Sequence, residues 1–175
     1  QEDRDRATEL LACEGVVPDD FMVCFQLGAS ESQKRWPPFR FAELAHILRL
    51  RYKAKIVLLG VEAERPLGEE FTKLDTGPSI SFFGKTSLGV LAAVLERSKL
   101  LVTNDTGTMH VAAAVRCPTV LVSVGTVHFR ETGPYAPGNY AIESTIKPDL
   151  KTPLISGDQF GFEMRAAIKP DAVAK

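Results

Sequence analysis

One segment of the sequence groups side chains that are suited to holding a phosphate. Residues 104–110 read Asn-Asp-Thr-Gly-Thr-Met-His, where an apolar run ends and a helix is expected to begin. A helix start presents unpaired N–H groups and a partial positive charge to an anion. The glycine permits close approach, and the two threonines can donate hydrogen bonds. The alternative is that Asp105 only caps the helix and that His110 is a satisfied interior histidine.

A second loop places cations beyond the end of another apolar run. Residues 28–36 end in Lys34, Arg35 and Trp36, so the two charged side chains can reach the same crevice. Residues 34–55 hold seven Lys or Arg side chains and one Glu, a local net charge of +6. We expect the arginines further along to form the solvated face of a helix and Lys34, in the loop, to serve an anion site.

Glu62 stands just after an apolar run that stops at Gly60. Doubly wound folds often place at this position an acid that accepts hydrogen bonds from ribose hydroxyls. The sequence has no GxGxxG after the first apolar run, and it has neither GxxxxGK[ST] nor GxSxG. These absences argue against a dinucleotide dehydrogenase, a P-loop NTPase and an esterase-like hydrolase.

The composition is that of an ordinary folded domain. The chain has 175 residues, 45% of them hydrophobic and 25% charged, with a net charge of −1, which predicts one domain with a substantial core. The balanced charge gives no reason to expect nucleic acid as a partner. Three widely spaced cysteines fit a reducing compartment, and no stretch approaches the ~20 apolar residues of a membrane span. We therefore expect a cytoplasmic protein.

Unbroken apolar runs alternate with amphipathic segments along the chain. The runs predict strands over 21–27, 55–60, 79–83, 99–103, 118–124 and 140–143, and the other segments predict helices over 4–14, 38–52, 62–74, 88–95, 106–115 and 170–175. Such alternation predicts an α/β fold with a doubly wound parallel sheet, Rossmann-like and covered on both faces. We expect a helical arm or linker over 1–20 and the Rossmann-like domain over 21–175, with its ligand beyond the carboxyl ends of the strands.

Three separated segments, taken together, resemble a known family. They are residues 28–30 with 34–37 (GAS and KRWP), 59–62 (LGVE) and 103–114 (TNDTGTMHVAAA). Their order and spacing are similar to the C-terminal half of the ADP-heptose:lipopolysaccharide heptosyltransferases, glycosyltransferase family 9. The segment 133–138 (GPYAPG) is similar to that family as well. The resemblance extends over residues 21–175, and D-T-G-x-x-H is its most specific part.

The resemblance implies a GT-B glycosyltransferase, in which two Rossmann-like domains face each other and the C-terminal one holds a nucleotide-sugar donor. The chain would be the donor-binding domain of an inverting enzyme that transfers heptose from ADP-heptose to the lipopolysaccharide inner core, without metal or cofactor. The base that activates the acceptor belongs to the N-terminal half, so this chain alone is expected to be inactive. The implied partners are ADP-heptose or ADP and, through the N-terminal half, the lipopolysaccharide acceptor. Peripheral association with the cytoplasmic side of the inner membrane is also implied.

The resemblance further implies roles for individual residues. Lys34 neutralises the donor diphosphate, Asp105 is the second catalytic candidate, and Glu62 holds the ribose. The implied donor-binding residues are Ser30, Lys34, Glu62, Thr86, Asp105, Thr106, Gly107, Thr108 and His110.

Two positions depart from the family pattern. Residues 123–126 read Ser-Val-Gly-Thr where a Phe-Gly-Pro-Thr-like turn is expected, and Ala29 stands where some members carry a hydroxyl residue. The departures leave two alternatives open. One is a GT-B transferase that uses another nucleotide sugar, and the other is a noncatalytic nucleotide-binding module.

Overall fold

Six parallel strands form one sheet in the computed structural model, which describes residues 1–124, 138–144 and 166–174. The strands are β1 (Met22–Gln26), β2 (Lys55–Leu59), β3 (Ser79–Ser81), β4 (Leu100–Thr103), β5 (Thr119–Ser123) and β6 (Tyr140–Glu143). Their order is β3-β2-β1-β4-β5-β6, and every neighbouring pair is parallel. This order is that of a doubly wound Rossmann-like sheet, so the expected fold class is confirmed.

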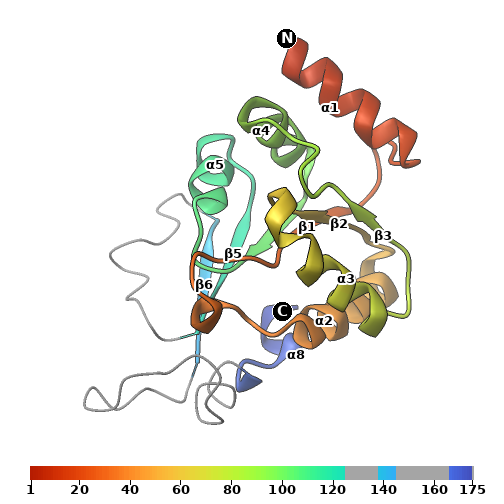
Figure 1. Cartoon of the computed structure of the whole chain (residues 1–175). Helices are drawn as coiled ribbons and strands as arrows, with labels where there is room; N and C mark the ends of the chain where they lie inside the picture. The colour runs from red at the N-terminus through yellow and green to blue at the C-terminus, as the bar shows by residue number, and fades with distance from the viewer. Residues whose placement is uncertain (125–137, 145–165, 175) are drawn as a thin grey trace.

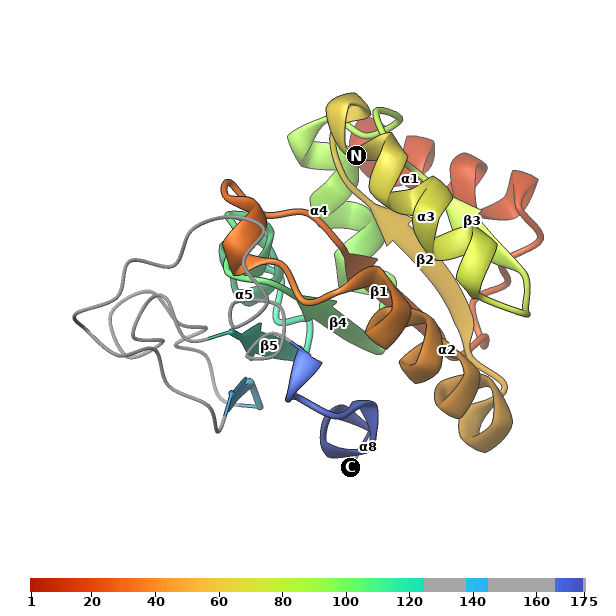
Figure 2. The same cartoon turned by 60° about the horizontal axis from the view of Figure 1, so that its bottom comes forward.

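Helices cover both faces of this sheet. In the described part of the chain they are α1 (Glu2–Cys13), α2 (Pro38–Tyr52), α3 (Arg65–Leu74), α4 (Leu88–Arg97), α5 (Thr108–Ala114) and α8 (Pro170–Val173), with 3-10 turns η1 (Ser32–Lys34) and η2 (Glu62–Glu64). Figure 1 shows α1, α4 and α5 on one face and α2, α3 and α8 on the other. Figure 2 shows α8 beside α2, on which it packs.

Strands β1, β2, β4 and β5 are largely buried because their side chains alternate between two apolar layers. In β1, Val23 and Phe25 belong to the layer under α2 and α3, where Phe25 stacks edge-on against Phe71. Met22 and Cys24 belong to the layer under α1 and α4. A strand that is covered on both faces needs apolar residues at every position, and this explains the unbroken apolar runs of the sequence.

Local sequence signals determine where several of the helices begin. Helix α2 begins at Pro38, whose fixed φ suits a first turn, and α4 begins after Ser87, whose side chain accepts the N–H of Val90. Two starts differ from expectation. The segment from Glu62 first makes the 3-10 turn η2 and becomes α-helical only at Arg65. Helix α5 begins at Thr108, two residues later than expected.

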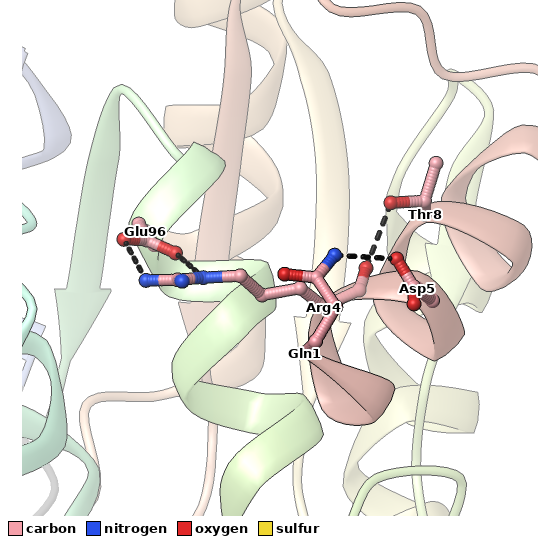
Figure 3. Close-up of polar contacts among 5 residues, drawn as sticks. All are labelled: Gln1, Arg4, Asp5, Thr8 and Glu96. Carbon is pink, nitrogen blue, oxygen red and sulfur yellow. Dashed lines mark hydrogen bonds and ion pairs between the residues drawn. The ribbon is translucent and has the colours of Figure 1, made fainter.

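Helix α1 packs on α4 at the surface of the sheet. Ala7 and Leu11 are buried in the layer that the two helices share. Arg4 of α1 donates to both carboxylate oxygens of Glu96 in α4, each at 2.9 Å, as Figure 3 shows together with contacts inside α1. Helix α1 thus contributes to the same core as the sheet, and the assignment of residues 1–20 as a separate arm or linker stays a prediction.

The arginines of α2 hold neighbouring segments instead of forming a purely solvated face. Both Nη atoms of Arg49 bind the Asp75 carboxylate, at 2.6 and 2.7 Å, and the Asp75 side chain is only 1% exposed. The Nε of Arg40 donates to the carbonyl of Ala166 at 3.1 Å. The expectation of a solvated basic face is therefore wrong for Arg40 and Arg49, because their partners come from segments remote in sequence.

Candidate functional site

A cavity of about 860 Å³ opens at the carboxyl ends of β1, β2 and β4. Doubly wound folds bind their ligands at this edge of the sheet. The cavity is lined by all nine residues that were expected in the donor site: Ser30, Lys34, Glu62, Thr86, Asp105, Thr106, Gly107, Thr108 and His110. They meet because β3, β2, β1 and β4 are successive neighbours and parallel, so that the loops following them emerge at one edge.

The loop from β4 to α5 brings polar side chains to the cavity. Gly107 is the N-cap of α5 and no side chain caps this helix, so Asp105 does not act as its cap. His110 is exposed and lines the cavity, so it is not an interior histidine. The alternative in which Asp105 caps the helix and His110 is an interior histidine is therefore wrong.

Asn104 ties this loop to the loop after β1. Its fully buried side chain accepts the backbone N–H of Trp36 at 2.8 Å and donates to the carbonyls of Leu27 at 2.9 Å and Gly28 at 3.3 Å. Both ends of the loop that carries Lys34 are thereby anchored to one amide. The sequence marks Asn104 only as a turn former, because its partner Trp36 is 68 residues away.

Lys34 lies at the end of the 3-10 turn η1 and lines the cavity. Its Nζ is 2.8 Å from Glu31 Oε1, and its side chain is 19% exposed. Hydrogen bonds from Lys34 and Gln33 hold the pKa of Glu31 below its ordinary value, so this carboxylate is charged at neutral pH. Arg35 does not reach the cavity in the same way, because its guanidinium donates to the carbonyl of Ala29 at 3.0 and 3.3 Å.

Two carboxylates follow β2, and they are held differently. Glu62 is exposed and both of its oxygens bind the guanidinium of Arg65, at 2.5 and 2.6 Å. The hydrogen bond from Arg65 lowers the pKa of Glu62. Glu64 is half-buried, and its Oε2 accepts from Gln26 Nε2 at 3.0 Å and from the N–H of Val61 at 3.1 Å. Glu64 is therefore the more firmly oriented of the two.

The chain makes room for the Glu64 carboxylate with two glycines. A Cβ on Gly28 would lie 1.7 Å from Glu64 Oε1, and a Cβ on Gly60 would lie 2.7 Å from Oε2. The glycines stand just past the ends of the neighbouring strands β1 and β2. Glycine after both strands was the one sequence signal for this carboxylate. It was too weak to find Glu64, because it does not say which side chain fills the space.

Apolar side chains complete the wall of the cavity. Val61 and Leu88 line it although they are 63% and 71% exposed, respectively. Large apolar side chains left exposed at a cavity mouth suit a planar or apolar part of a ligand. Gly84, which also lines the cavity, has a φ of +68°, which favours glycine, and a Cβ there would lie 2.5 Å from Glu62 Oε2.

Several expectations concern residues that the structure leaves undescribed. The unusual turn at 123–126 is described only to residue 124, and of the segment 133–138 only residue 138 is described. Within the described ranges, no three His, Cys, Asp or Glu side chains gather as metal ligands. In that same part of the chain, no helix has the length and apolar character needed to cross a bilayer.

The chain is similar to known glycosyltransferases in sequence and in structure. The family model for glycosyltransferase family 9 (heptosyltransferase) matches residues 1–153. The lipooligosaccharide heptosyltransferase 2 of Haemophilus influenzae is 34% identical over 91 residues, 50% of this chain and 26% of that protein. The match thus spans about a quarter of that relative's length.

Two solved structures share the fold over nearly the whole chain. The glycosyl transferase family 9 protein of Veillonella parvula has a TM-score of 0.83 at 28% identity, over 99% of this chain and 49% of that one. The Escherichia coli ADP-heptose lps heptosyltransferase II has a TM-score of 0.75 at 26% identity, over 97% and 49%. This chain therefore corresponds to about half of each.

Sequence and structure lead to the same assignment. The family model covers most of the chain, and residues from three of the segments that first suggested the resemblance line one cavity at the carboxyl edge of the sheet. On these grounds the chain belongs to glycosyltransferase family 9, the heptosyltransferases.

Proposed function

We propose that this chain is the donor-binding, C-terminal half of an inverting heptosyltransferase that transfers heptose from ADP-heptose to the lipopolysaccharide inner core. The observation that carries the proposal is the convergence of all nine expected donor-site residues on one cavity. The similar E. coli protein is an ADP-heptose lps heptosyltransferase, which supports the choice of donor. The acceptor and the membrane surface would be met through the N-terminal half of the enzyme.

Lys34 would stabilise the departing ADP. The charge on a nucleoside diphosphate grows as the glycosidic C–O bond breaks, and a fixed cation aimed at that charge lowers the barrier. Lys34 is the lysine that lines the cavity, and its side chain is only 19% exposed. Asp105 lines the same cavity and is the second candidate for contact with the reacting sugar. No metal ion or cofactor is required in this proposal.

The loop after β2 would hold the ribose. Glu62 was expected to do so from its position, and Glu64 is better oriented because Gln26 and Val61 hold its carboxylate. Glu62 first has to leave its ion pair with Arg65. We propose that a carboxylate of this loop accepts the ribose hydroxyls, with Glu62 and Glu64 as the two candidates.

Calorimetric titration with ADP tests the proposal. The chain should bind ADP, and Lys34→Ala should weaken binding by about 1–3 kcal/mol, the scale of a charge-assisted hydrogen bond. Lys99→Ala is the matched control, because Lys99 lies just before β4 at the opposite, amino edge of the sheet. Equal affinities of the wild type and Lys34→Ala would remove Lys34 from the phosphate role. Tighter binding of UDP or GDP than of ADP would favour another nucleotide sugar.

A comparison of ADP with 2′-deoxy-ADP tests the ribose contact. The variant that lacks the ribose contact should lose the preference for ADP, while its affinity for 2′-deoxy-ADP stays near that of the wild type. Glu62→Gln and Glu64→Gln, measured side by side, decide which carboxylate is used. If both variants keep the wild-type preference, this loop does not hold the ribose.

The chain alone should bind donor without transferring heptose. Alignment of two substrates across a cleft contributes on the order of 7–11 kcal/mol to lowering a barrier, and one wall of the cleft cannot supply it. The assay mixes the chain with ADP-heptose and acceptor lipopolysaccharide and follows ADP release and heptose incorporation. Robust incorporation would place the base within these 175 residues, with Asp105 and His110 the first to substitute.

A further inference from the structure

We propose that Gln26 is a positioning residue that makes the Thr108 hydroxyl a hydrogen-bond acceptor toward the ligand, so that Thr108 selects a hydroxyl of the donor sugar and does not bind a phosphate oxygen. The inference rests on the proposed function and deepens it, because it assigns one part of the same cavity to one part of the donor. Gln26, Glu64 and Thr108 all line the cavity.

The amide of Gln26 can be oriented in only one way. Its Nε2 is 3.0 Å from Glu64 Oε2, and an ionised carboxylate accepts hydrogen bonds but donates none. Glu64 is itself held by the N–H of Val61. Gln26 is only 5% exposed. A flipped amide would place its carbonyl oxygen next to the Glu64 carboxylate, where almost no solvent could screen the repulsion between the two acceptors. The –NH2 group therefore points to Glu64 and the carbonyl oxygen points away from it.

This orientation determines where the proton of Thr108 lies. The Thr108 hydroxyl is 3.3 Å from Gln26 Oε1, and an amide oxygen has no proton to give. In this contact the single hydroxyl proton of Thr108 therefore points to Gln26, and the hydroxyl presents only lone pairs to the cavity. A diphosphate at neutral pH also presents only lone pairs, whereas a sugar hydroxyl brings a proton.

The neighbouring hydroxyl of Thr106 is oriented inward in the same way. Thr103 donates its one proton to the carbonyl of Asn104 at 2.8 Å. The 3.3 Å contact between Thr103 and Thr106 then needs the proton of Thr106. Both threonine hydroxyls of this loop thus direct their protons into the protein, contrary to the expectation that they donate to the ligand. Lys34, Ser30 and backbone N–H groups are left to meet the phosphates.

The test compares the affinities of the 175-residue chain for ADP and for ADP-heptose by calorimetry. Thr108→Val keeps the shape of the side chain and removes the acceptor. It should lower the ratio of ADP-heptose affinity to ADP affinity about five-fold or more, the effect of losing one hydrogen bond. Thr108→Ser should restore the ratio. Gln26→Leu should lower it as well, because the hydroxyl proton is then free to turn toward the cavity.

The control and the adverse outcomes separate this inference from the proposed function. Thr72→Val, which removes a hydroxyl that donates to Gly68 within α3, should leave the ratio unchanged. If Thr108→Val leaves the ratio unchanged, whether by weakening both ligands equally or by weakening neither, Thr108 does not meet the heptose and the inference is wrong. If the wild type binds neither ligand, the proposed function fails, and the inference that rests on it fails too.

Discussion

Asn104 is the residue whose side chain does most to shape the candidate site. It satisfies the N–H of Trp36 and two carbonyls with one fully buried amide. Asn104→Ala should lower the free energy of unfolding by about 2–4 kcal/mol, since it leaves a buried N–H and buried carbonyls without partners. Urea unfolding measures this loss. The same variant should weaken ADP binding, because the loop that carries Lys34 loses its anchor.

Asn139 provides the matched control for this substitution. Its Oδ1 accepts the N–H of Thr119, at the far side of the sheet beside β6. Asn139→Ala should therefore cost less stability and leave ADP affinity unchanged. Equal effects of the two substitutions on ADP affinity would show that the anchoring by Asn104 is not specific to the site.

Glu31 competes with a bound diphosphate for Lys34. The ion pair between them is 2.8 Å long, and the lowered pKa of Glu31 keeps its carboxylate charged down to pH values below the ordinary range of a glutamate. Glu31→Gln should tighten ADP binding about two- to five-fold near neutral pH, because the competing charge is gone. Calorimetry at two salt concentrations measures the change. Glu9→Gln, which breaks another pair of residues three positions apart, with Arg6, should leave the affinity as it is.

The docking of helix α1 depends on small buried side chains more than on its surface ion pair. Ala7 is fully buried against α4, whereas Arg4 and Glu96 are 61% and 43% exposed in their side chains. Ala7→Leu overfills this contact and should lower the free energy of unfolding by about 1–3 kcal/mol. Arg4→Ala should shift the melting temperature much less. A larger shift from Arg4→Ala would show that the ion pair holds the helix.

The three cysteine thiols of the folded molecule should differ sharply in their reactivity. Cys13 is exposed, while Cys24 and Cys117 are buried in the core. Burial raises the pKa of both core thiols to about 12, so neither forms a reactive thiolate at neutral pH. A thiol reagent such as Ellman's should therefore modify one cysteine in the folded chain and three after unfolding. Rapid reaction of two or more thiols in the folded chain would contradict this packing.

The same two thiols predict how stability changes at alkaline pH. Their folded-state pKa values lie above the ordinary value of about 9, so the folded state holds their protons longer than the unfolded state does. The stability they contribute is fully present below pH 9 and is lost as the pH rises toward 12. Urea unfolding at pH 7, 9 and 10 should show this decline. Cys24→Ala should make the decline shallower, and an identical slope would place its cause elsewhere.

Much of the fold could be predicted because its signals are local. The first strand was expected over 21–27 and runs from Met22 to Gln26, since an apolar run bounded by polar and glycine residues marks a strand that is covered on both faces. The start of α5 was predicted less well. Thr106 bonds to Thr103 and remains in the loop, and Gly107 becomes the N-cap.

The order of the amino acids alone predicts the parallel sheet, the edge of the sheet on which the polar loops lie and the residue types of the candidate site. Only the tertiary structure showed that Asn104 anchors the loop of Lys34, that Glu64 rests against two glycines, and that Gln26 orients Thr108. The physical reason is that these contacts, apart from the one between Gly60 and Glu64, join residues dozens of positions apart. They exist only because β1 lies between β2 and β4, an order that follows from packing both faces of the sheet and that no local pattern records.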